Sequence, residues 1–82
     1  MPQAVDISNF AFNPTPVNIQ AGTQIVWTNH DGDAHTVVAD DGSFQAGVLN
    51  QGQAFSQIVT APGSHSYHCS IHPFMNGTIV VQ

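Results

Sequence analysis

Short segments in which apolar and polar residues alternate run through the whole chain, separated by Gly, Pro, Asn and Asp. Alternation with a period of two indicates a strand that buries one face. We expect strands in the segments 5–12, 17–20, 24–28, 35–39, 54–60, 65–69 and 77–81. No stretch of ten or more residues has a helical period. The pattern predicts an all-β protein.

The first of these segments contains a slip in its alternation. Val5 and Ile7 share one phase and Phe10 and Phe12 the other, which predicts one strand with a β-bulge near Asn9. Counted in this way, the chain has seven to eight short strands with a turn about every 8–12 residues, which is typical of a sandwich or barrel. We predict a Greek-key β-sandwich.

Residues 43–52 are irregular and contain glycine, so no strand is predicted there. We expect Phe44 and the Val48-Leu49 pair to anchor this segment in the core. The aromatic residues as a group are also expected in the core, namely Phe10, Phe12, Trp27, Phe44, Phe55 and Tyr67.

The length of 82 residues predicts a single domain, which we take as 1–82. A domain of this size buries only about 60% of the surface that its unfolded chain exposes, so a bound metal would help to stabilise it. The chain has one cysteine, Cys69. An internal disulfide is therefore excluded, and metal binding, a reactive thiol or simple packing remain as its uses.

The charge composition is unusual, because the chain has no Lys or Arg and five Asp, for a formal net charge of −5. Nucleic-acid binding is excluded, since contacts to phosphate depend on cationic side chains. Membrane insertion is not expected, because no apolar run approaches the roughly 18 residues of a membrane span. We expect the acidic side chains to be solvated, with Asp40-Asp41-Gly42 forming a turn.

The segment that carries chemistry has the spacing C-x2-H-x2-M and lies in a loop between two predicted strands. It places Cys69, His72 and Met75 within a few residues of one another, and His35 opens a strand some thirty residues upstream. Two His and one Cys with a weak axial Met are the ligand set of blue-copper electron-transfer sites. The other histidines, which are His30, His65 and His68, are expected to have no role in metal binding.

Two segments carry a resemblance to a known family. Residues 63–69 read G-S-H-S-Y-H-C, similar to the G-x-Y-x-Y-x-C approach to the ligand loop in cupredoxins, and residues 34–38 match their P-H-N-V segment. The chain resembles the amicyanin, plastocyanin and pseudoazurin group. The short gap from His72 to Met75 resembles amicyanin in particular. The resemblance implies a cupredoxin-like sandwich with one type 1 copper ion held by His35, Cys69, His72 and Met75.

Three positions depart from that pattern. Ala34 stands where the family usually has Pro. Thr36 stands where it often has an Asn that ties the two ligand loops together, so a weaker tie is expected. Ile71 replaces a Pro and therefore has a backbone N–H. We hypothesise that this N–H donates to the Cys69 sulfur and raises the reduction potential.

The resemblance implies a one-electron carrier and not an enzyme, with His72 as the electron port. Pro73 and Phe74 would form an apolar patch for weak, transient docking to redox partner proteins. We expect a monomer in a periplasmic or other extracytoplasmic compartment, although no leader precedes the patterned sequence.

Other functions remain open from the sequence alone. One is a copper carrier or storage protein without redox work, and another is a redesigned or trimmed cupredoxin with no physiological partner. A copper enzyme would need further histidine clusters. Structural zinc would want four strong ligands, and thioether is a poor one.

Overall fold

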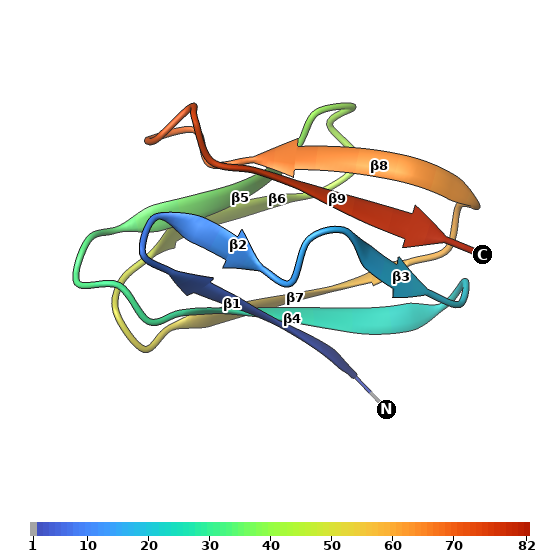
Figure 1. Cartoon of the computed structure of the whole chain (residues 1–82), viewed down its shortest axis with the longest axis horizontal. Coiled ribbons are helices and arrows are strands. Elements are labelled where there is room, and N and C mark those ends of the chain that lie inside the picture. Colours follow the sequence, from blue (N-terminus) through green and yellow to red (C-terminus); the bar gives the residue numbers. More distant parts are fainter. Residues whose placement is uncertain (1) are drawn as a thin grey trace.

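The computed structural model describes residues 2–82, so Met1, the first residue of the predicted domain 1–82, lies outside the described part. Within residues 2–82 the chain forms nine strands and no helix, arranged as two packed sheets (Figure 1). The strands are β1 (Gln3–Ser8), β2 (Ala11–Asn13), β3 (Val17–Ile19), β4 (Thr23–Asn29), β5 (His35–Ala39), β6 (Gln45–Leu49), β7 (Ala54–Val59), β8 (Gly63–His68) and β9 (Asn76–Val81). The predicted all-β sandwich is confirmed, although the count of seven to eight strands was too low.

The two sheets have the orders β2-β1-β4-β7 and β3-β9-β8-β5-β6. β1 runs parallel to β4, and β3 runs parallel to β9. The remaining pairs are antiparallel. Each sheet therefore joins segments that lie far apart in the sequence.

The core lies between the sheets and is built from alternate residues of the strands, as the period of two requires. In β4, for example, Ile25, Trp27 and Asn29 are buried while their neighbours are partly or fully exposed. Most of the predicted aromatic core is confirmed by burial, namely Phe12, Trp27, Phe44 and Tyr67, with Phe55 packed partly buried against it. Phe10 is an exception, since 39% of it is exposed.

The predicted bulge near Asn9 is wrong, because the first segment is a hairpin of two strands. Ser8 pairs with Ala11, so Asn9 and Phe10 form a two-residue turn with φ angles of 53° and 57°. The turn reverses the chain, and both β1 and β2 then direct alternate apolar residues to the core. The slip in the alternation marked this reversal.

The expectation that residues 43–52 contain no strand is also wrong, because β6 lies there and pairs with β5. The register between these strands shifts between His35 and Val37, which disturbs the alternation that sequence analysis relies on. Leu49 is buried as predicted, whereas Val48 is 57% exposed.

One end of the sandwich, on the left in Figure 1, holds the β1–β2 turn, the β4–β5 loop, the β6–β7 loop and the β8–β9 loop. We call this end the ligand pole, because it carries Phe10, His35 and residues 69–75. Asp40 and Asp41 form a turn elsewhere, closed by a hydrogen bond from Gly42 N–H to the Ala39 carbonyl, as predicted. The part of the chain that the structure describes has no helix of the length and apolar character needed to cross a membrane.

Candidate metal centre

Three donor side chains converge at the ligand pole. The Cys69 Sγ atom lies 3.8 Å from His35 Nδ1 and 3.7 Å from His72 Nδ1, and the three donor atoms all lie within 4.8 Å of one another. Cys69 and His35 are fully buried, and His72 is partly exposed. Among residues 2–82 this is the one group of three or more His, Cys or acidic side chains close enough to share a metal ion.

The spacing of these donors fits a metal ion. Bond lengths of about 2.0–2.1 Å to nitrogen and 2.3 Å to sulfur, with an angle of 120° between them, place sulfur and nitrogen about 3.8 Å apart. The two observed distances between sulfur and nitrogen agree with that value. One thiolate and two imidazoles are also the equatorial donors of blue-copper sites.

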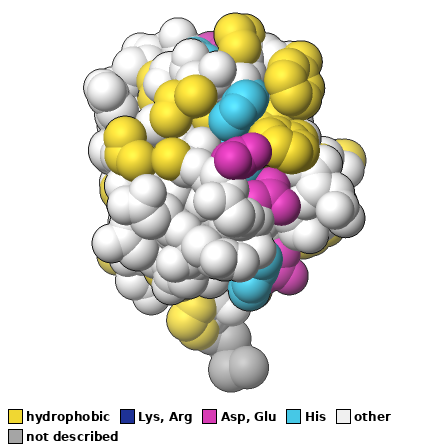
Figure 2. All heavy atoms as spheres, turned by 90° about the vertical axis from the view of Figure 1, so that its left-hand side faces the viewer, with side chains coloured by type: hydrophobic (Ala, Val, Ile, Leu, Met, Phe, Trp, Pro, Cys, Tyr) yellow, Lys and Arg dark blue, Asp and Glu magenta, His cyan; other side chains and the backbone are white. Residues whose placement is uncertain are grey.

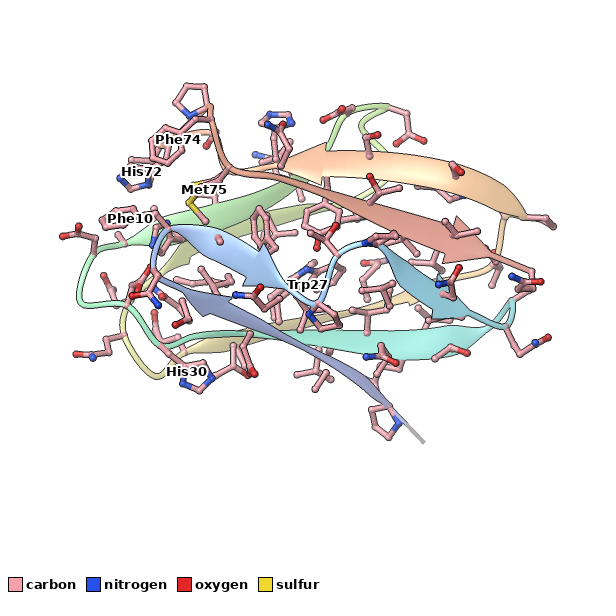
Figure 3. All side chains as sticks on the ribbon, in the orientation of Figure 1. Phe10, Trp27, His30, His72, Phe74 and Met75 are labelled. Atoms are coloured by element: carbon pink, nitrogen blue, oxygen red, sulfur yellow. The ribbon has the colours of Figure 1, made fainter. Side chains whose placement is uncertain are left out.

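Met75, the fourth predicted ligand, lies beside this group. Its side chain is 2% exposed, and Figure 3 shows it directed toward the same end of the molecule as His72. Two backbone hydrogen bonds shape the loop, from Cys69 N–H to the Met75 carbonyl (3.2 Å) and from Met75 N–H to the His72 carbonyl (2.9 Å). The loop is thereby folded so that all three of its predicted ligands face one region.

His35 is oriented by a carboxylate in the β4–β5 loop. Its Nε2 lies 2.9 Å from Asp31 Oδ2, where it donates if it carries the proton. This tautomer leaves the lone pair of Nδ1 facing the Cys69 sulfur. The predicted solvation of the acidic side chains is therefore wrong for Asp31, whose side chain is only 14% exposed.

Asn29 holds that loop in place from the end of β4. Its Nδ2 donates to the Asp33 carbonyl (2.9 Å) and to the Leu49 carbonyl (2.8 Å), and its Oδ1 accepts from Asp31 N–H (2.9 Å). The side chain is fully buried. Its position in an alternating strand, where an apolar residue is expected, is the signal that could have identified it.

Thr36 ties the two ligand-bearing segments together. Its Oγ1 accepts from Ser70 N–H (2.8 Å) and lies 2.9 Å from the Ser70 hydroxyl. A hydroxyl thus makes two contacts between the segments, so the tie is present although Asn is absent. The role of Ser70 has no signal in the sequence, because it depends on β5 and the β8–β9 loop meeting.

The Cys69 sulfur accepts from Thr36 N–H at 3.4 Å and lies 3.8 Å from Thr36 Oγ1. The donor is therefore Thr36 and not Ile71, whose hypothesised bond is not found in the described part of the chain. Ile71 instead lies at the surface of the loop, 46% exposed.

Burial and hydrogen bonding act in opposite directions on the Cys69 thiol. Burial raises its pKa, but hydrogen bonds from Thr36 N–H, from the His35 and His72 rings and from His72 N–H outweigh this effect. The pKa falls from its ordinary value of 9.0 to about 6. The thiol is therefore largely a thiolate at neutral pH, which is the form that binds metals.

Two aromatic side chains lie against the imidazoles of the ligand pole. The Phe10 ring lies edge-on to His35 and His72, with centroid distances of 5.4 and 5.1 Å, and the Phe74 ring lies 5.9 Å from His72. Phe74 is 68% exposed. Figure 2, which faces this pole, shows apolar side chains gathered around a histidine, with Asp side chains beside it.

The three remaining histidines lie outside the donor group. His30 pairs with Asp6 at 3.0 Å, His68 with Asp40 at 2.5 Å, and His65 Nε2 lies 2.7 Å from a backbone carbonyl. These contacts agree with the interpretation of these residues as strand and surface histidines.

Comparison with known proteins places this geometry in context. Residues 1–82 match a family described as copper binding proteins, plastocyanin/azurin family. The chain is 29% identical to amicyanin of Paracoccus denitrificans and 34% identical to amicyanin-alpha of Methylorubrum extorquens, in each case over 95% of its own length. It spans 63% and 70% of those two relatives. It is also 31% identical to plastocyanin of Scenedesmus fuscus, of which it covers 92%.

Solved structures of copper proteins are also similar to this chain. A reduced amicyanin variant superposes with a TM-score of 0.89 at 28% identity, covering 99% of this chain and 82% of that one. A copper-containing nitrite reductase from Thermus scotoductus superposes with a TM-score of 0.91 at 29% identity, but only 22% of its chain is covered.

Proposed function

The chain belongs to the plastocyanin/azurin family of copper-binding proteins, and from this premise we propose that it is a one-electron carrier with a single copper ion. The ligands in this proposal are His35, Cys69, His72 and Met75. The observation that carries it is the pair of distances from Cys69 Sγ to the two imidazole nitrogens, 3.8 and 3.7 Å, which match a shared trigonal metal.

Copper in this site would supply the exchange of one electron between Cu(II) and Cu(I). The protein's part is to keep the ligands in one arrangement throughout. His35 is held by Asp31, the Cys69 sulfur by Thr36 N–H, and the ligand loop by its own backbone hydrogen bonds. Such a constrained geometry would suit both charge states of the metal, so little rearrangement of these residues would be needed.

Electrons would enter and leave through His72, because it is the partly exposed imidazole of the group whereas His35 is buried. Phe10, Ile71 and Phe74 present apolar surface at the same pole. The partner in this proposal is a redox protein that docks weakly through an apolar contact around its own redox centre. Since the chain has no Lys or Arg, it has no cationic side chains of those types for the partner to recognise, and its acidic or apolar surface must serve instead.

The remaining parts of the proposal concern the setting of the protein. We take residues 1–82 as one domain that acts as a monomer in a periplasmic or other extracytoplasmic compartment. For the compartment alone, the proposal follows the amicyanin and plastocyanin relatives.

We propose no enzymatic activity. The nitrite reductase that resembles this chain is much larger, since the chain covers 22% of it. Within residues 2–82 there is one group of three metal donors, which supports a single mononuclear site.

Adding Cu(II) to the metal-free protein tests the proposal. We expect stoichiometric binding of one copper ion with an intense blue colour, and loss of that colour in Cys69→Ser. Reversible voltammetry and fast self-exchange would then separate an electron carrier from a copper storage protein. A protein that stays colourless with Cu(II), or that binds copper without a reversible potential, contradicts the proposed function.

A further inference from the structure

The turn between β1 and β2 has a conformation that does not suit its sequence. Asn9 and Phe10 both have positive φ, at 53° and 57°. Asn tolerates this region, but a side chain such as Phe disfavours it, and two-residue hairpin turns of this kind strongly prefer Gly at the second position. The protein therefore holds Phe10 in a strained backbone conformation.

The Asp31 carboxylate, in the β4–β5 loop at the same end of the molecule, stabilises that conformation. Its Oδ1 accepts from Asn9 N–H at 2.8 Å, and its Oδ2 accepts from Phe10 N–H at 2.9 Å. Both donors of the turn thus point at one side chain, which comes from the β4–β5 loop. Hydrogen bonds to a carboxylate are stronger than those between neutral groups, so this contact offsets the strain.

The same carboxylate also binds one of the candidate copper ligands. Asp31 Oδ2 lies 2.9 Å from His35 Nε2, so a single acidic side chain joins the strained turn to the buried imidazole. The contact selects the tautomer whose Nδ1 is free to face the sulfur.

The consequence for Phe10 is a fixed place over the metal centre. Its ring lies edge-on to both imidazoles, at 5.4 Å from His35 and 5.1 Å from His72, and it is 6.4 Å from Phe74. Figure 3 shows Phe10 beside His72 and Met75 at the ligand pole. A Gly at this position would relax the turn but would leave the rings uncovered.

We propose that Asp31 and Phe10 form a clasp that positions His35 and shields the metal centre from water. Asp31 fixes the ring of His35 and holds the turn, and Phe10 covers the two imidazoles. Both are positioning residues, since neither is a ligand. The inference rests on the proposed copper site and names two residues outside the ligand set that tune it.

Asp31→Asn tests the first half of the clasp. Asn keeps the size of the side chain but offers one acceptor oxygen in place of two and removes the charge, so at least one of the three contacts is lost. The matched control is Asp33→Asn, which removes an equal charge from the same loop. Asp33 is exposed, and within residues 2–82 its side chain has no hydrogen bond.

We expect Asp31→Asn to weaken Cu(II) binding by about tenfold or more, as is usual when the partner of a ligating His is removed. Asp33→Asn should change it far less. Because the carboxylate favours the more highly charged ion, Cu(I) binding should fall less, and each factor of ten between the two ions raises the potential by about 59 mV. Equal shifts in the two variants would overturn the role of Asp31.

Phe10→Gly tests the second half and does not depend on the first. Gly accepts positive φ, so the relief of strain offsets the loss of the half-exposed ring and the fold should be retained. We expect copper release to a chelator to become faster by on the order of tenfold. Phe10→Leu, which keeps an apolar side chain, should give a smaller change. Release from Phe10→Gly at the wild-type rate would overturn the shielding role.

A third measurement separates the clasp from the copper site itself. In the metal-free protein, the Asn9 and Phe10 amides should exchange slowly with solvent, and nitrogen NMR should find the proton of His35 on Nε2. Asp31→Asn should accelerate the exchange of these amides, whereas Asp33→Asn should not. Failure of the wild type to bind copper would contradict the proposed function, while unprotected amides in the wild type would contradict the clasp.

Discussion

Thr36 joins the two segments that carry the candidate ligands through one hydroxyl group. Its Oγ1 accepts from Ser70 N–H at 2.8 Å and lies 2.9 Å from the Ser70 hydroxyl, and the residue is only 6% exposed. The adjacent N–H donates to the Cys69 sulfur. One residue therefore holds both the neighbouring loop and the thiolate.

Thr36→Val should destabilise the protein, because the shape is kept while the partly buried Ser70 N–H loses its acceptor. An unsatisfied buried donor costs about 1–3 kcal/mol, and denaturant unfolding of the metal-free protein measures this cost. Thr36→Ser keeps the hydroxyl and serves as the control. If Val and Ser at this position gave equal stabilities, the hydroxyl would have no part in joining the loops.

The Cys69 thiol gives a prediction about pH. Its pKa in the folded protein is lowered to about 6, so in the metal-free protein its ultraviolet thiolate absorbance should titrate with a midpoint near pH 6. Between about pH 6 and 9 the folded state holds a thiolate and the unfolded state a thiol. Stability should therefore rise with pH across this range, and this contribution is lost as pH falls through 6.

Cys69→Ser is the control for that titration, since it removes the group and should flatten its contribution to the dependence of stability on pH. A midpoint close to the ordinary cysteine value of 9.0 would show that the hydrogen bonds to sulfur do not outweigh burial.

At the level of elements, the pairing of β8 with β9 depends on one glycine. Gly77 lies opposite Tyr67 in the ladder, and a Cβ added there would be 2.5 Å from the tyrosine Oη and 2.8 Å from Cε2. Tyr67 is fully buried, with its ring against Phe12 and Trp27 at centroid distances of 4.7 and 5.5 Å. The ring therefore cannot move aside without disturbing the core.

Gly77→Ala should lower the free energy of unfolding by about 1–3 kcal/mol or more, as overpacking of a core does. Gly47→Ala in β6 is the matched control, because nothing lies within 4 Å of its added Cβ and its φ is not in the left-handed region. Calorimetry or denaturant unfolding of both variants gives the comparison. A Gly77→Ala protein as stable as Gly47→Ala would show that the strands separate easily to admit the methyl group.

The strands that sequence analysis predicted well are those whose alternation is regular. β4 buries Ile25, Trp27 and Asn29 in strict alternation, and its predicted range differs from the observed one by one residue at each end. The β1–β2 hairpin and β6 were missed because their signals are weaker. Asn9-Phe10 lacks the Gly that marks such turns, and β6 pairs through a shifted register.

The residues of the candidate site also fall into those that the sequence identifies and those that it does not. Cys69, His72 and Met75 share one loop, so their spacing alone suggested a site, and family resemblance added His35. Asp31 could not be found in this way, since its role depends on contacts with a turn 21 and 22 residues away in sequence. Such contacts follow from the tertiary structure and leave no local pattern.

For the molecule as a whole, the charge is of one sign only, because it has five Asp and no Lys or Arg. Two copies that meet to exchange an electron therefore repel each other at low ionic strength. Salt screens this repulsion, with a Debye length that falls from about 30 Å at 0.01 M to about 8 Å at 0.15 M.

The rate constant for self-exchange between the Cu(I) and Cu(II) forms should therefore increase as salt is added, which NMR line broadening can measure. Self-exchange should be faster in Asp33→Asn than in the wild type at low salt, and the two rate constants should be closer at high salt. A rate that falls with added salt would mean that local attraction at the ligand pole outweighs the net charge.

The long-range assembly of the ligand pole has a consequence for folding. The Cys69 sulfur contacts residues 33 and 34 positions earlier in the chain, and the nearby Asp31 contacts residues more than 20 positions earlier. The entropy of closing these loops must be overcome before the donors meet, which makes the contact order high and folding slow. The blue colour of the copper-bound protein would therefore appear only when the whole topology has formed. Its loss in denaturant would follow global unfolding instead of local fraying.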